Sequence, residues 1–189
     1  MSFRTALALA ALLVLSPALA PADEISDTLA AARSAYDEGD IARALEELSF
    51  AQALLQDMRT DSLSQYLPPA PEGWTSEQHN VTSSLIAFAP NAIGSAADYS
   101  DGTDVFTLTI SIDNPLMAMF SQMASNPMLA RAAGASLDRL GDTKVLNMDG
   151  TLTTVIASRI LVQAEGAPVE IMMPIYSMID FAGLEGFDF

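Results

Sequence analysis

The hydrophobic pattern of this chain changes its period once, at the stretch LPPAPEGW, residues 67–74. Before this stretch, apolar residues recur at helical spacing. After it, short runs rich in Val, Ile, Thr and Leu are separated by turn residues. Pro68, Pro69 and Pro71 favour an extended linker. We therefore predict an α+β protein with a helical segment at residues 23–66, a linker at residues 67–73 and a second domain at residues 74–189.

The segment 23–66 is predicted to be an αα-hairpin. Two apolar stripes flank Gly39-Asp40, which supplies the turn between the helices. The stripes are Ile25, Leu29, Ala32 and Tyr36 on the first helix, and Ile41, Ala44, Leu45, Leu48, Ala51, Leu55 and Met58 on the second.

Part of this hairpin, AAARSAYDEGDIARALEELSFAQAL, resembles one tetratricopeptide repeat. The resemblance covers one repeat length, we find no second copy, and Gln56 stands where the family usually closes the unit with proline. A solenoid needs about three or more repeats to bury its faces, so the resemblance implies support from the following domain, another copy of the chain or a partner. A plain αα-hairpin without repeat ancestry is the alternative. The residues that carry the resemblance are Ala32, Tyr36, Gly39-Asp40, Ala44-Leu45, Leu48 and Ala51.

Residues 74–189 are predicted to form an antiparallel β-sheet with short helices inserted in it and a helix at the C-terminal end. The strand candidates are residues 83–88, the run DVFTLTISI, and a meander of TKVLNM, TLTTVIASR and ILVQAEG. Asp149-Gly150 is the strongest hairpin signal. Pro168 fits the first turn of the last helix, and Pro174 should kink it. This helix is expected to direct Ile171, Ile175, Met178 and Ile179 toward the sheet.

The order of PEGW, strands, a helical insertion, a three-strand meander and a closing helix followed by IDF looks like the Mog1/PsbP-like group of small α+β domains. It also looks like exported bacterial proteins that carry a helical hairpin ahead of such a domain. Members of this group mostly act as non-catalytic accessory or assembly modules. The resemblance therefore implies a class of role, with no site residue to transfer.

The first 22 residues, MSFRTALALAALLVLSPALAPA, have the parts of a secretory signal peptide. Arg4 is followed by ten apolar residues from Ala6 to Leu15 and then by small residues. The apolar run is shorter than the roughly 20 residues of a transmembrane helix. We expect cleavage after Ala22, or alternatively after Ala20, and a periplasmic or secreted product. An uncleaved peptide that acts as an anchor is the lesser alternative.

Composition excludes several classes of function. With 24 acidic residues against 8 basic ones, the net charge is −16, which repels nucleic acid and anionic membranes. The chain has no cysteine, so it can form neither disulfides nor thiolate sites. Lys144 is the only lysine, His79 the only histidine, and no phosphate-binding loop or nucleophile motif is present. We expect His79 to be an exposed polar residue and we predict no cofactor.

The stretch DNPLMAMFSQMASNPMLARAAG concentrates four methionines. Asn114 and Asn126 each precede proline, which predicts two short capped helices. Leu116, Met119, Phe120 and Met123 share one apolar stripe, while Met117 and Met128 fall outside it. The cluster could be core packing, a partner-binding surface or a Cu(I) site, because thioethers are adaptable and soft. Helical spacing separates Met117 from Met119 by about 160°, which argues against the copper site.

The stretch DYSDGTD places Asp98, Asp101 and Asp104 around a glycine turn. Carboxylates in this position could hold Ca²⁺. The spacing departs from the usual calcium-loop pattern, and acids at a turn are typical of a solvated hairpin tip. The hairpin tip is therefore the expected structure.

Taken together, these features predict a non-catalytic exported binding or accessory protein that contacts a protein or a small apolar ligand. The protein partner would bind through the hairpin or the methionine segment. A carboxylate-based envelope hydrolase and a periplasmic copper carrier are the alternatives. The predicted contact residues are Met117, Met119, Phe120, Met123 and Met128 in the methionine segment, and Tyr36 and Phe50 on the hairpin.

Overall fold

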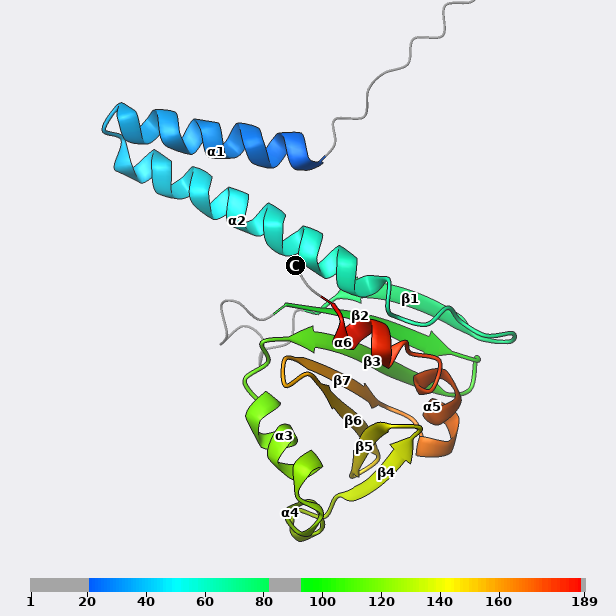
Figure 1. Cartoon of the computed structure of the whole chain (residues 1–189). Helices are drawn as coiled ribbons and strands as arrows, with labels where there is room; N and C mark the ends of the chain where they lie inside the picture. Colours follow the sequence, from blue (N-terminus) through cyan, green and yellow to red (C-terminus); the bar gives the residue numbers. More distant parts are fainter. Residues whose placement is uncertain (1–20, 82–92, 188–189) are drawn as a thin grey trace, which may run out of the picture. The chain divides into compact units, whose positions relative to one another are not determined.

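The computed structural model describes residues 21–81 and 93–187, which form two compact units that meet between Leu54 and Leu55 (Figure 1). We call residues 21–54 the hairpin unit and residues 55–187 the sheet unit. The predicted leader up to residue 20 and the strand candidate at residues 83–88 lie outside the described residues. Among the described residues, no helix combines the length and hydropathy needed to span a bilayer.

The hairpin unit consists of α1 (Pro21–Asp37) and the first part of α2 (Ile41–Ser64), as predicted. Gly39 turns the chain with a φ of +83°, a conformation open to glycine, and the Asp40 carboxylate accepts a hydrogen bond from the Arg43 N–H. The two helices pack through small side chains, since Ala32, Ala35, Ala44 and Ala51 are buried, together with Ile25 and Thr28. Small residues let the helix axes approach closely, but they bury little apolar surface.

The end of α2 belongs to the sheet unit. Leu63 and Leu67 are buried in the same apolar core as the strands, and the Tyr99 hydroxyl donates a hydrogen bond to the buried Pro68 carbonyl. The predicted linker at residues 67–73 is therefore anchored to the sheet at its start. The compact units divide inside α2, upstream of the prolines, because the apolar side chains at the end of this helix have a core to enter.

The sheet unit is built on one seven-stranded antiparallel sheet with the strand order β1-β2-β3-β7-β6-β5-β4. The predicted strands β3, β5, β6 and β7 are confirmed, as is the Asp149-Gly150 turn, where both residues have positive φ. The strands β1, β2 and β4 were not predicted. The bounds are β1 Thr75–Asn80, β2 Ile93–Ser100, β3 Val105–Ile112, β4 Ser136–Leu140, β5 Thr143–Met148, β6 Thr151–Ile156 and β7 Ile160–Glu165.

Helices cover both faces of this sheet. On one face, α5 (Val169–Tyr176), α6 (Phe181–Glu185) and the end of α2 bury alternate strand residues such as Leu108 and Val162. On the other face, α3 (Met117–Ser125) and α4 (Pro127–Ala132) cover a second cluster around Leu146 and Leu161. Side chains alternate in direction along each strand, so neighbouring residues such as Leu161 and Val162 point to opposite faces and belong to different clusters.

The C-terminal helix follows the prediction in part. Pro168 occupies the N-cap position just before α5, one residue earlier than the predicted first turn, and Pro174 lies inside the helix. Ile175 and Ile179 are buried as predicted, whereas Met178 is exposed. The helix also buries Met172 and Tyr176, and Asp180 begins a separate helix, α6, that was not predicted.

Candidate functional site

The hairpin unit exposes large apolar side chains to an unusual degree for such a small body. Tyr36 is 66% exposed and Leu45 60%, although both were predicted to belong to packed stripes. The reason is the alanine-rich interface, which occupies the facing sides of the helices and leaves the larger side chains on the flanks. The exposed large apolar residues of this unit are Leu29, Tyr36, Ile41, Leu45, Leu48 and Phe50.

Five of these six residues lie on the same side of the hairpin. Leu29 and Tyr36 each follow a buried α1 residue by four positions, and Leu48 follows the buried Ala44 by four. A four-residue step advances about 40° around a helix. Each of these exposed residues is therefore rotated by about 40° from the buried interface, in the N-to-C direction of its own helix. Because α1 and α2 run antiparallel, this rotation turns the exposed residues of both helices toward the same side of the hairpin. We call this surface the apolar strip; it consists of Leu29, Tyr36, Ile41, Leu45 and Leu48.

Phe50 stands apart from the apolar strip. It is half exposed, but it lies five residues from Leu45, which corresponds to about 140° around α2. Of the two hairpin residues predicted as contacts, the structure therefore groups Tyr36 with other apolar side chains and leaves Phe50 on a different side.

The hairpin unit that carries the apolar strip is acidic. Residues 24–54 contain seven carboxylates and only two basic residues, Arg33 and Arg43. Each arginine already pairs with an acid one turn along its own helix, Arg33 with Asp37 and Arg43 with Glu47, both at 3.9 Å. The hairpin unit therefore carries a net negative charge that is not compensated within it.

The methionine segment divides between core and surface. Met117, Phe120 and Met123 are buried against the sheet, whereas Met119 and Met128 are exposed, Met128 by 82%. The predicted stripe is confirmed at Phe120 and Met123 and in part at Leu116, but it is wrong at Met119, and Met117 outside the stripe packs inward. Apolar residues occur on almost every side of this short helix, so the contact with β5 and β6 selects which of them are buried.

The predicted caps of this segment are confirmed for one helix. The Asn126 side chain accepts hydrogen bonds from the N–H groups of Met128 and Leu129 at the start of α4. The Asn114 side chain accepts one from the Leu116 N–H, and α3 itself begins later, at Met117. Because Met117 is buried and Met119 is exposed, the three thioethers considered for copper do not share one face of the helix.

The acidic turn is a hairpin tip, as expected. The Asp101 carboxylate accepts hydrogen bonds from the N–H groups of Thr103 and Asp104, and these bonds lower its pKa. Asp98 lies away from this loop on β2, where it meets His79 at 3.3 Å and the Thr107 hydroxyl. The described residues contain no group of three or more His, Asp or Glu side chains placed to hold a metal ion.

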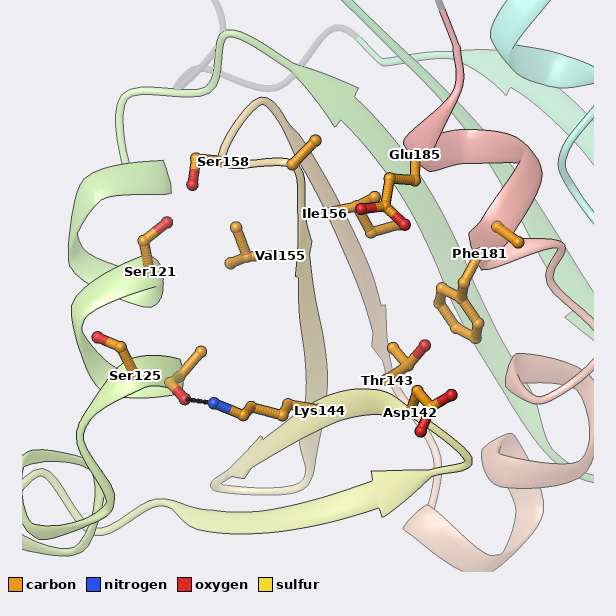
Figure 2. Close-up of a pocket in the computed structure, with 13 residues that line it drawn as sticks. Ser121, Ser125, Asp142, Thr143, Lys144, Val155, Ile156, Ser158, Phe181 and Glu185 are labelled. Carbon is orange, nitrogen blue, oxygen red and sulfur yellow. Dashed lines mark hydrogen bonds between the residues drawn. The ribbon is translucent and has the colours of Figure 1, made fainter.

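A cavity in the sheet unit was not predicted. It is open to solvent and has a volume of about 530 Å³, and the charged residues on its walls, Asp142, Lys144 and Glu185, are exposed. Figure 2 shows α3 on one side of it, α6 on the other, and the ends of β5 and β6 between them. Serine and threonine hydroxyls alternate with apolar side chains on its walls, among them Val155, Ile156 and Phe181.

The cavity lies where the ladder between β5 and β6 stops. These strands form only three residue pairs, which end at Leu146 and Thr153. Lys144 and Val155 would continue the ladder, but they line the cavity instead. Where β5 and β6 separate, the Thr154 hydroxyl donates a hydrogen bond to the Lys144 carbonyl at 3.2 Å. The pattern of side chains along β5 and β6 gave no signal of this interruption.

Charges of opposite sign occupy different parts of the cavity. The ammonium group of Lys144, the only lysine, donates a hydrogen bond at 3.1 Å to the Ala124 carbonyl near the end of α3. The Asp142 and Glu185 carboxylates lie on the side of α6 (Figure 2). The Ser121 hydroxyl oxygen is shielded from solvent and has no hydrogen-bond partner among the described residues.

The turn between β6 and β7 contributes a strained segment to the cavity rim. Ala157 and Ser158 have φ angles of +49° and +54°, in the left-handed region that favours glycine. Each such residue costs roughly 1–2 kcal/mol. Strain of this kind often occurs at functional sites, where the surrounding structure maintains it.

Comparison with known proteins found no relative of this chain. No family model matches it, and neither a curated protein nor a solved structure is significantly similar. The apolar strip and the cavity are therefore interpreted from their own geometry.

Proposed function

We propose that this protein is a non-catalytic exported binding protein whose hairpin unit docks a helix of another protein. The apolar strip is the observation that carries the proposal. Two antiparallel helices with large apolar side chains on one side form a seat for a third helix, in the manner of helix-in-groove recognition. The accessory role implied by the Mog1/PsbP-like resemblance agrees with this function.

The net charge of the hairpin unit favours a basic partner. A helix with an apolar face and flanking lysines or arginines would be attracted by the excess of carboxylates in this unit. A second copy of this chain would bring the same negative charges to the interface, so self-association is disfavoured. The partner we propose is therefore a basic amphipathic helix.

The free energy available from apolar burial predicts a weak and transient complex. Complete burial of one large apolar side chain contributes roughly 1.5–3 kcal/mol, and the strip residues are already about half buried. Five of them then supply on the order of 5 kcal/mol, which is comparable to the lower estimates of the cost of association. Apolar burial alone would therefore give little net affinity, and a dissociation constant as low as the micromolar range requires charge attraction and further contacts by the partner.

The test uses the chain that begins at Asp23 and two model helices. One peptide of about 18 residues, long enough to fold, carries leucines on one face and lysines on the other; the second carries glutamates in place of the lysines. Fluorescence anisotropy should detect binding of the basic peptide only, and added salt should weaken this binding.

Matched variants distinguish the strip from the rest of the hairpin. Leu45→Ser should weaken binding of the basic peptide, whereas Phe50→Ser should leave it unchanged, because Phe50 is also exposed but lies on another side of α2. Equal losses in the two variants, or equal binding of the acidic peptide, would refute the proposal.

A carboxylate-based hydrolase of envelope material is the second candidate. The observation in its favour is that two acids, Asp142 and Glu185, line the same cavity. If the protein releases new reducing ends from purified envelope polysaccharide, Asp142→Asn and Glu185→Gln should each abolish the release. No release from such material with the unmodified protein would exclude this activity on polysaccharide.

A further inference from the structure

We propose that the cavity between α3, α6 and the split ends of β5 and β6 binds a short zwitterionic peptide. The ligand would be held by its terminal charges and its main-chain amides. The site lies entirely within the sheet unit, so it is independent of the apolar strip.

The separated charges of the cavity specify the ends of the ligand. The Lys144 ammonium group uses one hydrogen bond on the Ala124 carbonyl, which leaves donors for a carboxylate. Asp142 and Glu185, on the side of α6, suit a terminal ammonium group. A ligand with a carboxylate at one end and an ammonium group at the other satisfies both sides.

One neighbouring cation reinforces the positive side. Arg139 on β4 is the direct partner of Lys144 across the β4–β5 ladder, and like charges in such a pair repel each other. Neither forms an ion pair within the part of the chain that the structure describes. A bound carboxylate would relieve this repulsion. A simple inorganic anion fits less well, because it would leave Asp142 and Glu185 without a cation.

The walls of the cavity suit the main chain and small side chains of a peptide. The β5–β6 ladder stops at Leu146 and Thr153, and Lys144 and Val155 beyond it line the cavity, so an extended peptide could lie along the parted strands. Ser121 lines the cavity, and its hydroxyl has no hydrogen-bond partner among the described residues. Val155 and Phe181 offer apolar surface to the side chains of the ligand.

The experiment is isothermal titration calorimetry of the chain that begins at Asp23 with three forms of trialanine. The free zwitterion should bind. N-acetylation removes the ammonium group and C-amidation removes the carboxylate, so each modified form should bind at least about tenfold more weakly, as expected for the loss of one charged hydrogen bond. Equal affinity for the three forms, or no binding of the zwitterion, would overturn the proposal.

Variants assign the binding to the cavity. Lys144→Gln should weaken binding of the zwitterion but should not change the affinity for the amidated form. Arg131→Gln is the control, since it removes an exposed positive charge on α4 that does not line the cavity, and it should not change the affinity. A loss in Arg131→Gln as large as in Lys144→Gln would contradict the site. Glu185→Gln, which should weaken binding of the zwitterion and of the amidated form, provides a second test if Lys144→Gln lowers the melting temperature.

Mass spectrometry of the trialanine after incubation separates binding from hydrolysis. Intact peptide is the expected result. Release of free alanine that stops in the Asp142→Asn variant would replace the binding proposal with a peptidase activity.

Discussion

The Tyr99 hydroxyl donates a hydrogen bond to the Pro68 carbonyl, and both residues are buried. This contact attaches the proline-rich segment to β2 in the middle of the apolar core. Tyr99→Phe keeps the ring but leaves a buried carbonyl without its partner. We expect the free energy of unfolding to fall by about 1–3 kcal/mol in urea titrations. Tyr36→Phe, at an exposed tyrosine, is the control and should change little. Equal stability of the two variants would show that the bond is unimportant.

Alkaline pH should destabilise the protein through buried tyrosines. Burial raises the pKa of Tyr99 from 10.0 to about 12 and raises the pKa of Tyr176 as well. A raised pKa means that the folded state holds the proton more tightly than the unfolded state. This stabilisation is complete below pH 10 and is lost as the pH rises toward 12. Urea midpoints measured across this interval should fall, and the fall should be smaller in Tyr99→Phe. A flat profile in the unmodified protein would contradict the prediction.

The end of α2 should contribute to the stability of the sheet unit. Leu63 is fully buried in its core, whereas Leu48 on the same helix is about half exposed. Leu63→Ala should lower the free energy of unfolding by about 2–5 kcal/mol, because it leaves a cavity in a packed core. Leu48→Ala should have a much smaller effect. Both are measured by urea denaturation, monitored by near-ultraviolet circular dichroism. A loss for Leu48→Ala as large as for Leu63→Ala would mean that the strip is packed in solution.

The methionines should separate into two classes under mild oxidation. Peroxide should convert the exposed Met128 and Met119 to sulfoxides well before the buried Met117 and Met123, and peptide mass spectrometry can follow each site. Because Met123 is buried and Met128 is exposed, Met123→Ala should lower the free energy of unfolding by about 2–5 kcal/mol, and Met128→Ala should have little effect. Rapid oxidation of Met123 would indicate that α3 leaves the sheet readily.

The strained turn at the cavity rim should be open to stabilisation. Ala157→Gly removes the steric cost of a positive φ and should raise the free energy of unfolding by up to about 1 kcal/mol, since the added freedom of the unfolded chain offsets part of the gain. Ala133→Gly, at a φ of −83°, lacks that gain and should lower stability. Thermal unfolding of both variants is the measurement. Destabilisation by Ala157→Gly would mean that the methyl group makes a contact worth more than the strain.

The fold could be predicted wherever the residue types of a segment and its hydrophobic pattern indicated the same secondary structure. β3 and the meander of β5, β6 and β7 are rich in β-branched residues and are bounded by strong turns, so their strand character is local. β1, with the sequence TSEQHN, is fully exposed, and β2 is largely Gly, Ala and Ser. Strands of this kind form because a neighbour supplies hydrogen bonds, and no local pattern records that neighbour.

By itself, the sequence determined the two helices with their turn, the α+β class, the antiparallel meander and the capped start of α4, because local propensity and hydrophobic period decide these features. Only the tertiary structure decided which side of α3 packs inward, since apolar residues surround that helix. It also decided that alanines would fill the α1–α2 interface and leave Leu45 and Tyr36 exposed. The cavity beside Lys144 could not be predicted from the sequence either. It exists where the paired strands β5 and β6 separate, and strand pairing depends on contacts with other parts of the sheet.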